Sequence, residues 1–329
     1  MNKLSRFALF TSLVFVSSVA NAEWVSSEQA IMGTRIHVEL WQDDNIDGQA
    51  AINAVMAEMR RIDELMSPHK KTSALYRINQ LASQQELRIS SEMFKLIARS
   101  IEFSRLTEGA FDITYASVGH LYNYRAHKRP DRKTIKKQLG KIDFHNIVLD
   151  KNRQTIRFTH TGVFIDLGGI AKGYAVDNGI KILQQRGIKS AIVSAGGDSR
   201  ILGNRHGRPW MMGIRNPRKH DGLLTRLPLW DTALSTSGDY ERYFIEDGVR
   251  YHHIIDPKTG DSARKLRSVT IIGPDAITTD ALSTSLFIMG IERGMALANQ
   301  LPDIDAIMID NKGRFFYSNG LQEPATTKP

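Results

Sequence analysis

Hydrophobic and polar positions follow two different periods in the first third of the chain. Ile36, Val38 and Leu40 alternate with polar residues, which predicts a strand over 34–40. Apolar residues then recur every three or four positions over 48–66, the spacing of one face of an amphipathic helix. This stripe contains several methionines, which we interpret as core residues and not as a cofactor site.

The rest of the chain predicts further helices mixed with short strands. A helix is predicted after Ser90–Ser91, a hairpin over 146–149 and 155–158, a helix from Gly168–Gly169 to about Gln185, and a strand over 191–194. Strands broken by Gly, Pro, Asp and Asn turns follow over 200–275, then helices over 279–289 and from Ile291, a strand pair over 306–309 and 314–317, and a frayed tail over 321–329. Because there is no regular strand–helix–strand alternation, the predicted fold class is α+β, as one domain over 23–329.

The N-terminal segment has the pattern of a cleavable signal peptide. Lys3 and Arg6 precede an apolar run over 7–16, and Ala20-Asn21-Ala22 has the form of an A-x-A cleavage site. The run is short for a permanent membrane anchor, which is the alternative interpretation. We expect cleavage after Ala22, removal of 1–22, and export of the mature protein to the periplasm.

Composition excludes several classes of function. Hydrophobic residues at 41% and charged residues at 24% of 329 are ordinary for a soluble globular protein. The chain has no cysteine, which excludes thiolate metal sites, cysteine nucleophiles and lipid attachment through an N-terminal cysteine. The formal charge of +9 is mild, and its densest basic run, over 125–137, is interpreted as a solvated loop and helix. Contact of this run with a phosphate or a membrane is the alternative, and a nucleic-acid partner is not expected.

The stretch FIDLGGIAKGYAVD, residues 164–177, is the first candidate for chemistry. Asp166 ends an apolar segment, and Gly168–Gly169 allows a turn at which the backbone can approach a ligand closely. Lys172 falls in the first turn of the following helix, where a lysine and free N–H groups suit a pyrophosphate. The spacing matches neither the dinucleotide GxGxxG pattern nor the P-loop. A tight turn with Asp166 as a cap and Lys172 in solvent is the alternative.

A second candidate is the segment TTDALSTS, residues 278–285. If Thr279 caps a helix, Asp280 and Thr284 are four positions apart and project from one face. A carboxylate beside a hydroxyl offers the hard oxygen ligands that suit Mg²⁺. The alternative is a polar first turn with a capping aspartate.

The third candidate is YHHIIDPKTG, residues 251–260. The DPKTG part is a turn signal, and adjacent histidines on a strand point to opposite faces. His252 and His253 therefore cannot both serve one site. A buried structural histidine is the alternative to a functional one.

Taken together, the motifs and their order resemble the FAD:protein FMN transferase (ApbE) family. The resemblance covers nearly the whole mature chain and rests on Met32-Gly33-Thr34, Met66-Ser67 with Ser73 and Asn79, TEGAFDIT over 107–114, the segment 166–177, Gly196-Gly197-Asp198, TSGDY over 236–240, HIIDPKTG over 253–260, DALST over 280–284, and Met289-Gly290. The family fold that this resemblance implies is α+β and is related to the tunnelling T-fold.

The resemblance also implies which residues hold the ligands. A Mg²⁺ ion would be bound by the backbone carbonyl of Gly169 and the side chains of Asp280 and Thr284. The flavin nucleotide would contact Met32, His69, Ala110, Phe111, Asp112, Asp166, Lys172 and His253. Three positions depart from the family pattern: His69 replaces an aromatic residue, the usual Pro-Leu pair after Thr114 is missing, and Thr279 replaces a small residue.

The implied activity is a phosphoryl transfer that depends on Mg²⁺ and uses FAD as substrate. FMN would pass from FAD to a Ser or Thr hydroxyl of a client flavoprotein of a respiratory or electron-transfer system, and AMP would leave. Lys172 and Asp280 would neutralise charge and hold the metal, and His253 is the candidate general base because imidazole titrates near neutral pH. Two alternatives stay open: an FAD pyrophosphatase that gives FMN and AMP, and an FAD carrier without turnover.

Overall fold

The computed structural model describes residues 22–43, 45–218 and 222–322. The predicted signal peptide, except for Ala22, and most of the predicted tail lie outside these residues. Within them, no helix is both long enough and apolar enough to cross a membrane.

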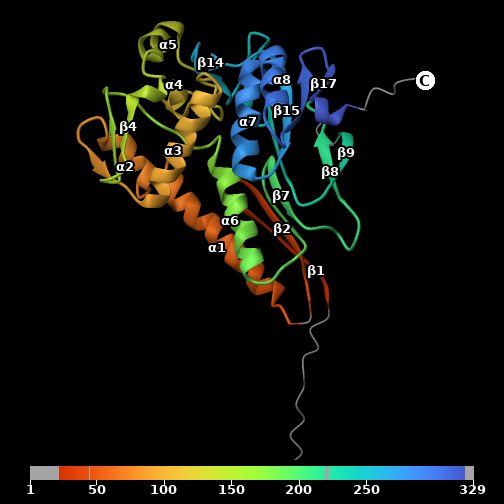
Figure 1. The fold of residues 1–329 in the computed structure, drawn as a ribbon. Helices are drawn as coiled ribbons and strands as arrows, with labels where there is room; N and C mark the ends of the chain where they lie inside the picture. The colour runs from red at the N-terminus through yellow and green to blue at the C-terminus, as the bar shows by residue number, and fades with distance from the viewer. Residues whose placement is uncertain (1–21, 44, 219–221, 323–329) are drawn as a thin grey trace, which may run out of the picture.

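A large antiparallel sheet forms the body of the molecule (Figure 1). In the described residues it has eight strands in the order β1-β2-β6-β7-β10-β15-β16-β17. The bounds are β1 Glu23–Ile31, β2 Thr34–Gln42, β6 Ala191–Ala195, β7 Asp198–Leu202, β10 Ala233–Gly238, β15 Leu266–Gly273, β16 Asp305–Asp310 and β17 Phe315–Tyr317. Every neighbouring pair is antiparallel, as expected for strands joined by hairpins and returning helices.

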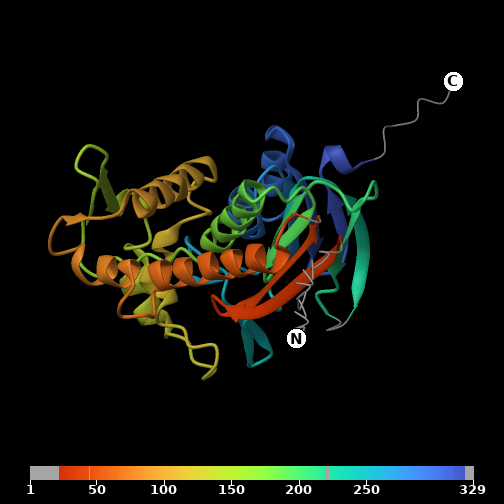
Figure 2. The same ribbon diagram turned by 90° about the horizontal axis from the view of Figure 1, so that it is seen from below.

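A row of helices covers one face of this sheet (Figures 1 and 2). These are α1 Gly48–Met66, α6 Ala171–Gln185, α7 Ala276–Met289 and α8 Ile291–Gln300. α1 packs on β1 and β2, α6 on β6 and β7, α7 on β10 and β15, and α8 on β16. The predicted stripe of α1 is buried, and Asp47 caps the helix by accepting a 2.8 Å hydrogen bond from Ala50 N.

A second lobe lies beside the helical layer and is best seen in Figure 2. It contains α2 Ala74–Leu81, β3 Leu87–Arg88, α3 Ser91–Leu106, α4 Ala116–Gly119, α5 Arg132–Leu139, β4 Ile147–Asp150 and β5 Thr155–Phe158. The strands of this lobe pair in the order β3-β5-β4. The predicted hairpin of β4 and β5 is therefore confirmed, and β3 pairs with the other edge of β5.

Three further hairpins extend from the main sheet. They pair β8 Trp210–Arg215 with β9 Leu223–Leu229, β11 Tyr243–Glu246 with β12 Val249–His252, and β13 Ile255–Asp256 with β14 Asp261–Ser262. Trp210 of β8 packs with Ile192 and Ile201 on the face of the sheet opposite the helices.

The predicted α+β class is confirmed, and the predicted helices and strands are present. One boundary is wrong: α7 begins at Ala276, and its N-cap is Asp275 and not Thr279. The reason is local, because the Asp275 carboxylate accepts the Thr278 N–H at 2.8 Å. Thr279 is fully buried in the first turn and shares a hydrogen bond with Ser235 on β10.

Candidate functional site

The close crossing of α6 and α7 brings the two main sequence motifs together. Gly173 sits at the crossing, where an added Cβ would overlap the carbonyl oxygen of Ala276. Gly173 N donates to the Asp280 carboxylate at 3.0 Å. The carboxylate of Asp177 accepts the Ala276 and Ile277 N–H groups, each at 2.9 Å. One end of α7 is thus held by a residue of α6.

Lys172 lies between two buried carboxylates at this crossing. Its ammonium pairs with Asp198 of β7 and lies 3.3 Å from Asp280 Oδ1. Burial opposes the charge on Lys172, but the two carboxylates outweigh it and raise the lysine pKa. Burial and then the charge of Asp198 raise the pKa of Asp280. The alternative of Lys172 in solvent is therefore wrong.

The other residues predicted to bind metal lie next to this ion-pair cluster. Thr284 is one turn beyond Asp280 on α7, and its hydroxyl would lie 3.6 Å from a Cβ placed on Gly169. Ser237 of β10 lies 3.2 Å from the same hydroxyl. Among the described residues, no three His, Cys, Asp or Glu side chains are grouped to hold a metal. A site here would therefore combine one carboxylate with hydroxyl and backbone oxygens.

The charge and the donor atoms of this cluster fit a hard cation. One lysine is shared by Asp198 and Asp280, so negative charge is in excess, and the side chains of both aspartates are only 3% exposed. The nearby donors are oxygens, which Mg²⁺ prefers. A cation near Asp280 would also favour its ionised form, which burial disfavours.

Asp166 and its turn lie at the edge of the cluster. Asp166 Oδ1 accepts Gly168 N at 2.6 Å, so the side chain caps the turn as well as facing the site. Burial raises the pKa of Asp166, while His69 and Arg242 act in the opposite direction through their charge. His69 and Arg242, which are far apart in sequence, therefore both lie near this carboxyl group.

The loop that contains Ala110, Phe111 and Asp112 has its side chains turned inward. All three residues are buried, and the ring of Phe111 would lie 3.2 Å from a Cβ on Gly169. Asp112 accepts hydrogen bonds from Thr114 and from Phe144 N, so its carboxylate is occupied within the protein. Burial raises its pKa to about 6.

The turn between β1 and β2 approaches His253 through Arg242. Met32 has a positive φ of 55°, and Gly33 O lies 3.5 Å from Arg242 Nη2. His253 N donates to Arg242 O at 3.1 Å. The imidazole Nδ1 of His253 is buried and has no hydrogen-bond partner within the described residues.

Burial and the nearby cations keep His253 uncharged. Desolvation first, and then the charges of Arg242, His252 and Lys172, lower the His253 pKa to about 3. The expectation that this imidazole titrates near neutral pH is wrong for the protein without ligand. His252 is the structural histidine of the pair, because its ring lies 2.6 Å from the Ala263 carbonyl oxygen.

Sequence reasoning missed three side chains of the site. Arg242 follows the TSGDY motif but has no pattern of its own, and Asp198 was named only within the Gly196-Gly197-Asp198 motif, without a role at the site. Tyr115 lies beside Asp166, whose charge helps raise the tyrosine pKa after burial does so. Only the three-dimensional arrangement reveals these contacts.

Comparison with known proteins gives a consistent result. The ApbE family model matches residues 32–308. An FAD:protein FMN transferase of Vibrio cholerae is 32% identical over 325 residues, which covers 96% of this chain and 97% of the relative. A protein of the same name from Haemophilus influenzae is 32% identical over 289 residues, with 84% of each chain covered.

Solved structures agree with the sequence relatives. The ApbE protein of Thermotoga maritima is similar with a TM-score of 0.85 and 34% identity, covering 91% of this chain and 98% of that one. The flavin transferase ApbE of Vibrio cholerae gives a TM-score of 0.82 and 31% identity over the same shares. The chain therefore belongs to the ApbE family.

Proposed function

We propose that this protein transfers FMN from FAD to a Ser or Thr hydroxyl of a client flavoprotein, depends on Mg²⁺, and releases AMP. The observation that carries the proposal is the cluster at the α6–α7 crossing, where Lys172, Asp198 and Asp280 lie beside Thr284 and Gly169. Relatives that share most of their length with this chain are named FAD:protein FMN transferases.

Asp280, Thr284 and the carbonyl of Gly169 would hold the Mg²⁺ ion. When bound, the ion supplies positive charge to the diphosphate oxygens of FAD. Lys172 adds a fixed cation at the same place, held by its ion pairs with Asp198 and Asp280. The first turn of α6 donates Gly173 N to the Asp280 carboxylate, and the positive end of the α6 dipole would add to the field at the diphosphate.

Arg242 would bind the substrate beside Asp166 and His253. Its guanidinium lies near Gly33 O, and it lowers the pKa of both Asp166 and His253 through its charge. Among the described residues it has no carboxylate partner within ion-pair distance. A guanidinium in this position can donate hydrogen bonds to phosphate oxygens.

The transfer step moves one phosphorus between two oxygens. The client hydroxyl oxygen bonds to the FMN-side phosphorus, the bond from this phosphorus to the bridging oxygen breaks, and AMP leaves with that oxygen. His253 would accept the hydroxyl proton at a ring nitrogen, and its neutral state in the free protein leaves it able to do so. The negative diphosphate would raise the imidazole pKa once bound, which makes it a better base.

Side chains near the flavin serve mainly to place the backbone. Phe111 and Asp112 are buried and bonded within the protein, so residues 110–112 would meet the ligand through backbone atoms. Met32 and His69 belong to turns at the rim and would contact the flavin nucleotide with their side chains.

The proposal is tested by incubating the purified protein with FAD, Mg²⁺ and a flavoprotein that contains an acceptor Thr. Mass spectrometry should find FMN added to one Ser or Thr, with AMP released in equal amount. Free FMN and AMP formed without a client would support the pyrophosphatase instead. FAD that stays intact and bound after long incubation would support the carrier and overturn the transferase.

We also propose that the mature protein acts in the periplasm. Support comes from Lys3, Arg6, the apolar run and Ala20-Asn21-Ala22. N-terminal sequencing of the protein from a periplasmic extract should begin at Glu23. Recovery of the intact N-terminus on membranes would contradict this proposal.

A further inference from the structure

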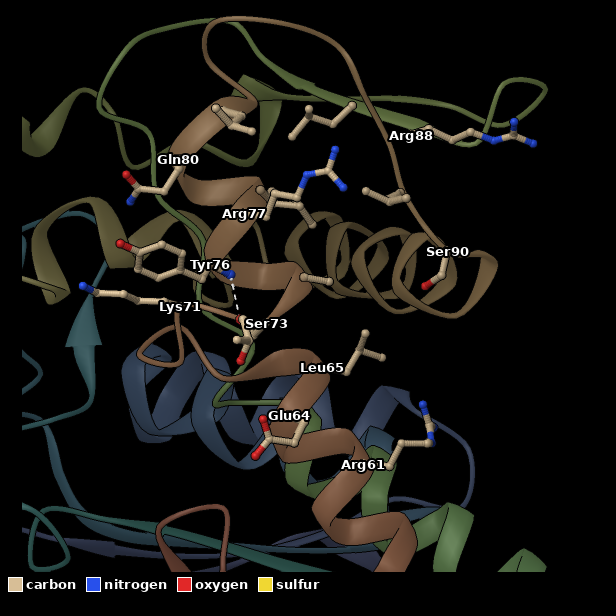
Figure 3. A pocket seen from close by; sticks show the side chains of 16 residues that line it. Arg61, Glu64, Leu65, Lys71, Ser73, Tyr76, Arg77, Gln80, Arg88 and Ser90 are labelled. Carbon is tan, nitrogen blue, oxygen red and sulfur yellow. Dashed lines mark hydrogen bonds between the residues drawn. The ribbon is translucent and has the colours of Figure 1, made fainter.

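A groove of about 750 Å³ lies on the second lobe, outside the Asp280 cluster (Figure 3). It runs between the C-terminal part of α1, helix α2, strand β3 and the start of α3. Neither Lys172 nor Asp280 lines it. The proposed transfer chemistry therefore gives this groove no role.

The groove combines an apolar floor with unpaired basic side chains. Leu65, Ile78 and Leu87 contribute apolar surface. Arg77 of α2 and Arg88 of β3 are exposed and lie at the rim of the groove on different elements, and in Figure 3 the Arg88 side chain extends outward, away from Arg77. Within the described residues, neither guanidinium has a hydrogen bond, an ion pair or an aromatic partner.

Other charged residues around the groove are already paired. Arg61 bonds to Glu58 and Glu92, and Glu64 pairs with Lys70 at 2.5 Å. Lys71, in the α1–α2 loop at one end of the groove, is exposed and is a third cation without a partner among the residues that the structure describes. The charge that remains available to a partner is therefore positive.

A short edge strand of the described residues, β3, also borders the groove. β3 is the outer strand of the sheet β3-β5-β4, and Leu87, Arg88 and Ile89 line the groove. An extended polypeptide can pair with such an edge through backbone hydrogen bonds. A lipid surface or a compact small molecule would leave these backbone groups unused.

Two hydrogen bonds connect α2, which lines the groove, to the backbone just before Asp166 in the candidate site. Asn79 of α2 accepts Ile165 N at 2.8 Å and donates to Ile165 O at 2.9 Å, directly before Asp166. The α1–α2 loop carries His69 near Asp166 and, two residues later, Lys71 at the groove. A chain segment in the groove would therefore lie near His69 and Asp166, at the edge of the site.

We propose that this groove binds an extended, acidic segment of the client flavoprotein, close in sequence to the residue that receives FMN. The inference rests on the proposed function for the identity of the partner. Because the Asp280 side chain is only 3% exposed, an acceptor hydroxyl must reach inward on an extended segment. Residues that flank the acceptor then pass over α2 and β3, where glutamate or aspartate meets Arg77 and Arg88.

Binding of a peptide tests this without any turnover. The probe is a fluorescent peptide that contains one Thr and alternates glutamate with valine, compared with a matched peptide that has lysine for glutamate. In fluorescence anisotropy without FAD or Mg²⁺, the acidic peptide should bind at least about tenfold more tightly, and less so at high salt. Because no FAD is present, the result does not depend on whether the protein is a transferase.

Charge-reversal variants locate the binding surface. Arg77→Glu and Arg88→Glu together should weaken acidic-peptide binding about tenfold, while the melting temperature stays unchanged because both side chains are exposed. Lys133→Glu and Lys137→Glu on α5 are the matched control, since both are exposed and make the same change in net charge. Equal weakening by the two pairs, or equal affinity for the two peptides, would overturn the proposal.

Discussion

The cluster around Asp280 and the groove beside α2 use charge in opposite ways. In the cluster, Lys172 forms ion pairs with carboxylates that are almost wholly buried. A hydrogen bond from Gly173 to Asp280 also connects α6 to α7 there. In the groove, Arg77 and Arg88 are exposed and unmatched within the described residues. Buried charges held in place by ion pairs are suited to stabilising the reacting phosphate groups, which are the same for every client. Exposed charges without partners are suited to attracting and binding a client protein from solution.

Removing the carboxylate from the cluster should have the largest effect. Asp280→Asn keeps the shape but removes the charge that faces Lys172, and we expect the transfer rate to fall at least about 100-fold, with loss of Mg²⁺ stimulation. The rate of FMN addition at several Mg²⁺ concentrations measures this. Asp275→Asn, which changes only the α7 cap, should keep Mg²⁺ dependence. Full activity of Asp280→Asn would rule out this metal site.

The second-largest effect is expected from a substitution that separates α6 from α7. A Cβ at position 173 would overlap a backbone oxygen of α7, so Gly173→Ala must push α6 and α7 apart. We expect a loss of about 2 kcal/mol in the free energy of unfolding, together with weaker Mg²⁺ binding. Urea unfolding measures the first quantity, and Gly140→Ala, which meets nothing within 4 Å, is the control. A variant as stable as its parent would show that the crossing is not tight.

Arg242→Ala should affect binding of the diphosphate alone. We expect FAD to bind about tenfold more weakly, while riboflavin, which lacks phosphate, binds as before. Calorimetric titration of both ligands measures the difference. Arg215→Ala is the control, because Arg215 is exposed and lies 3.8 Å from Glu241. An equal loss for both ligands would place Arg242 at the flavin ring.

The last prediction concerns stability and pH, apart from the transfer reaction. The His253 pKa is lowered from 6.5 to about 3 by burial and nearby cations. Between these values the unfolded chain binds a proton that the native state does not, so the free energy of unfolding falls as pH falls. His253→Asn should lose less stability than the parent between pH 7 and pH 4 in urea unfolding. Parallel curves would show that this imidazole titrates alike in both states.

Strong periodic segments could be predicted from sequence, and contacts across the fold could not. The stripe over 48–66 gave the bounds of α1, but nearly every residue of α7 is buried, so periodicity did not mark its start. Spacing placed Lys172 in a helical first turn, as observed, yet did not reveal that Asp198 lies opposite it. Arg242 and the groove depend on tertiary packing, which leaves no local pattern.

The bonds between α6 and α7 also have a consequence for folding. Gly173 N and Asp280 are 107 positions apart, and Asp177 and Ala276 are 99 apart. Contacts this distant in sequence form late, because a long loop must close first. The residues that would bind Mg²⁺ thus come together only when α6 and α7, which are distant in sequence, pack on each other. Mg²⁺ should therefore slow unfolding of the finished protein far more than it speeds folding.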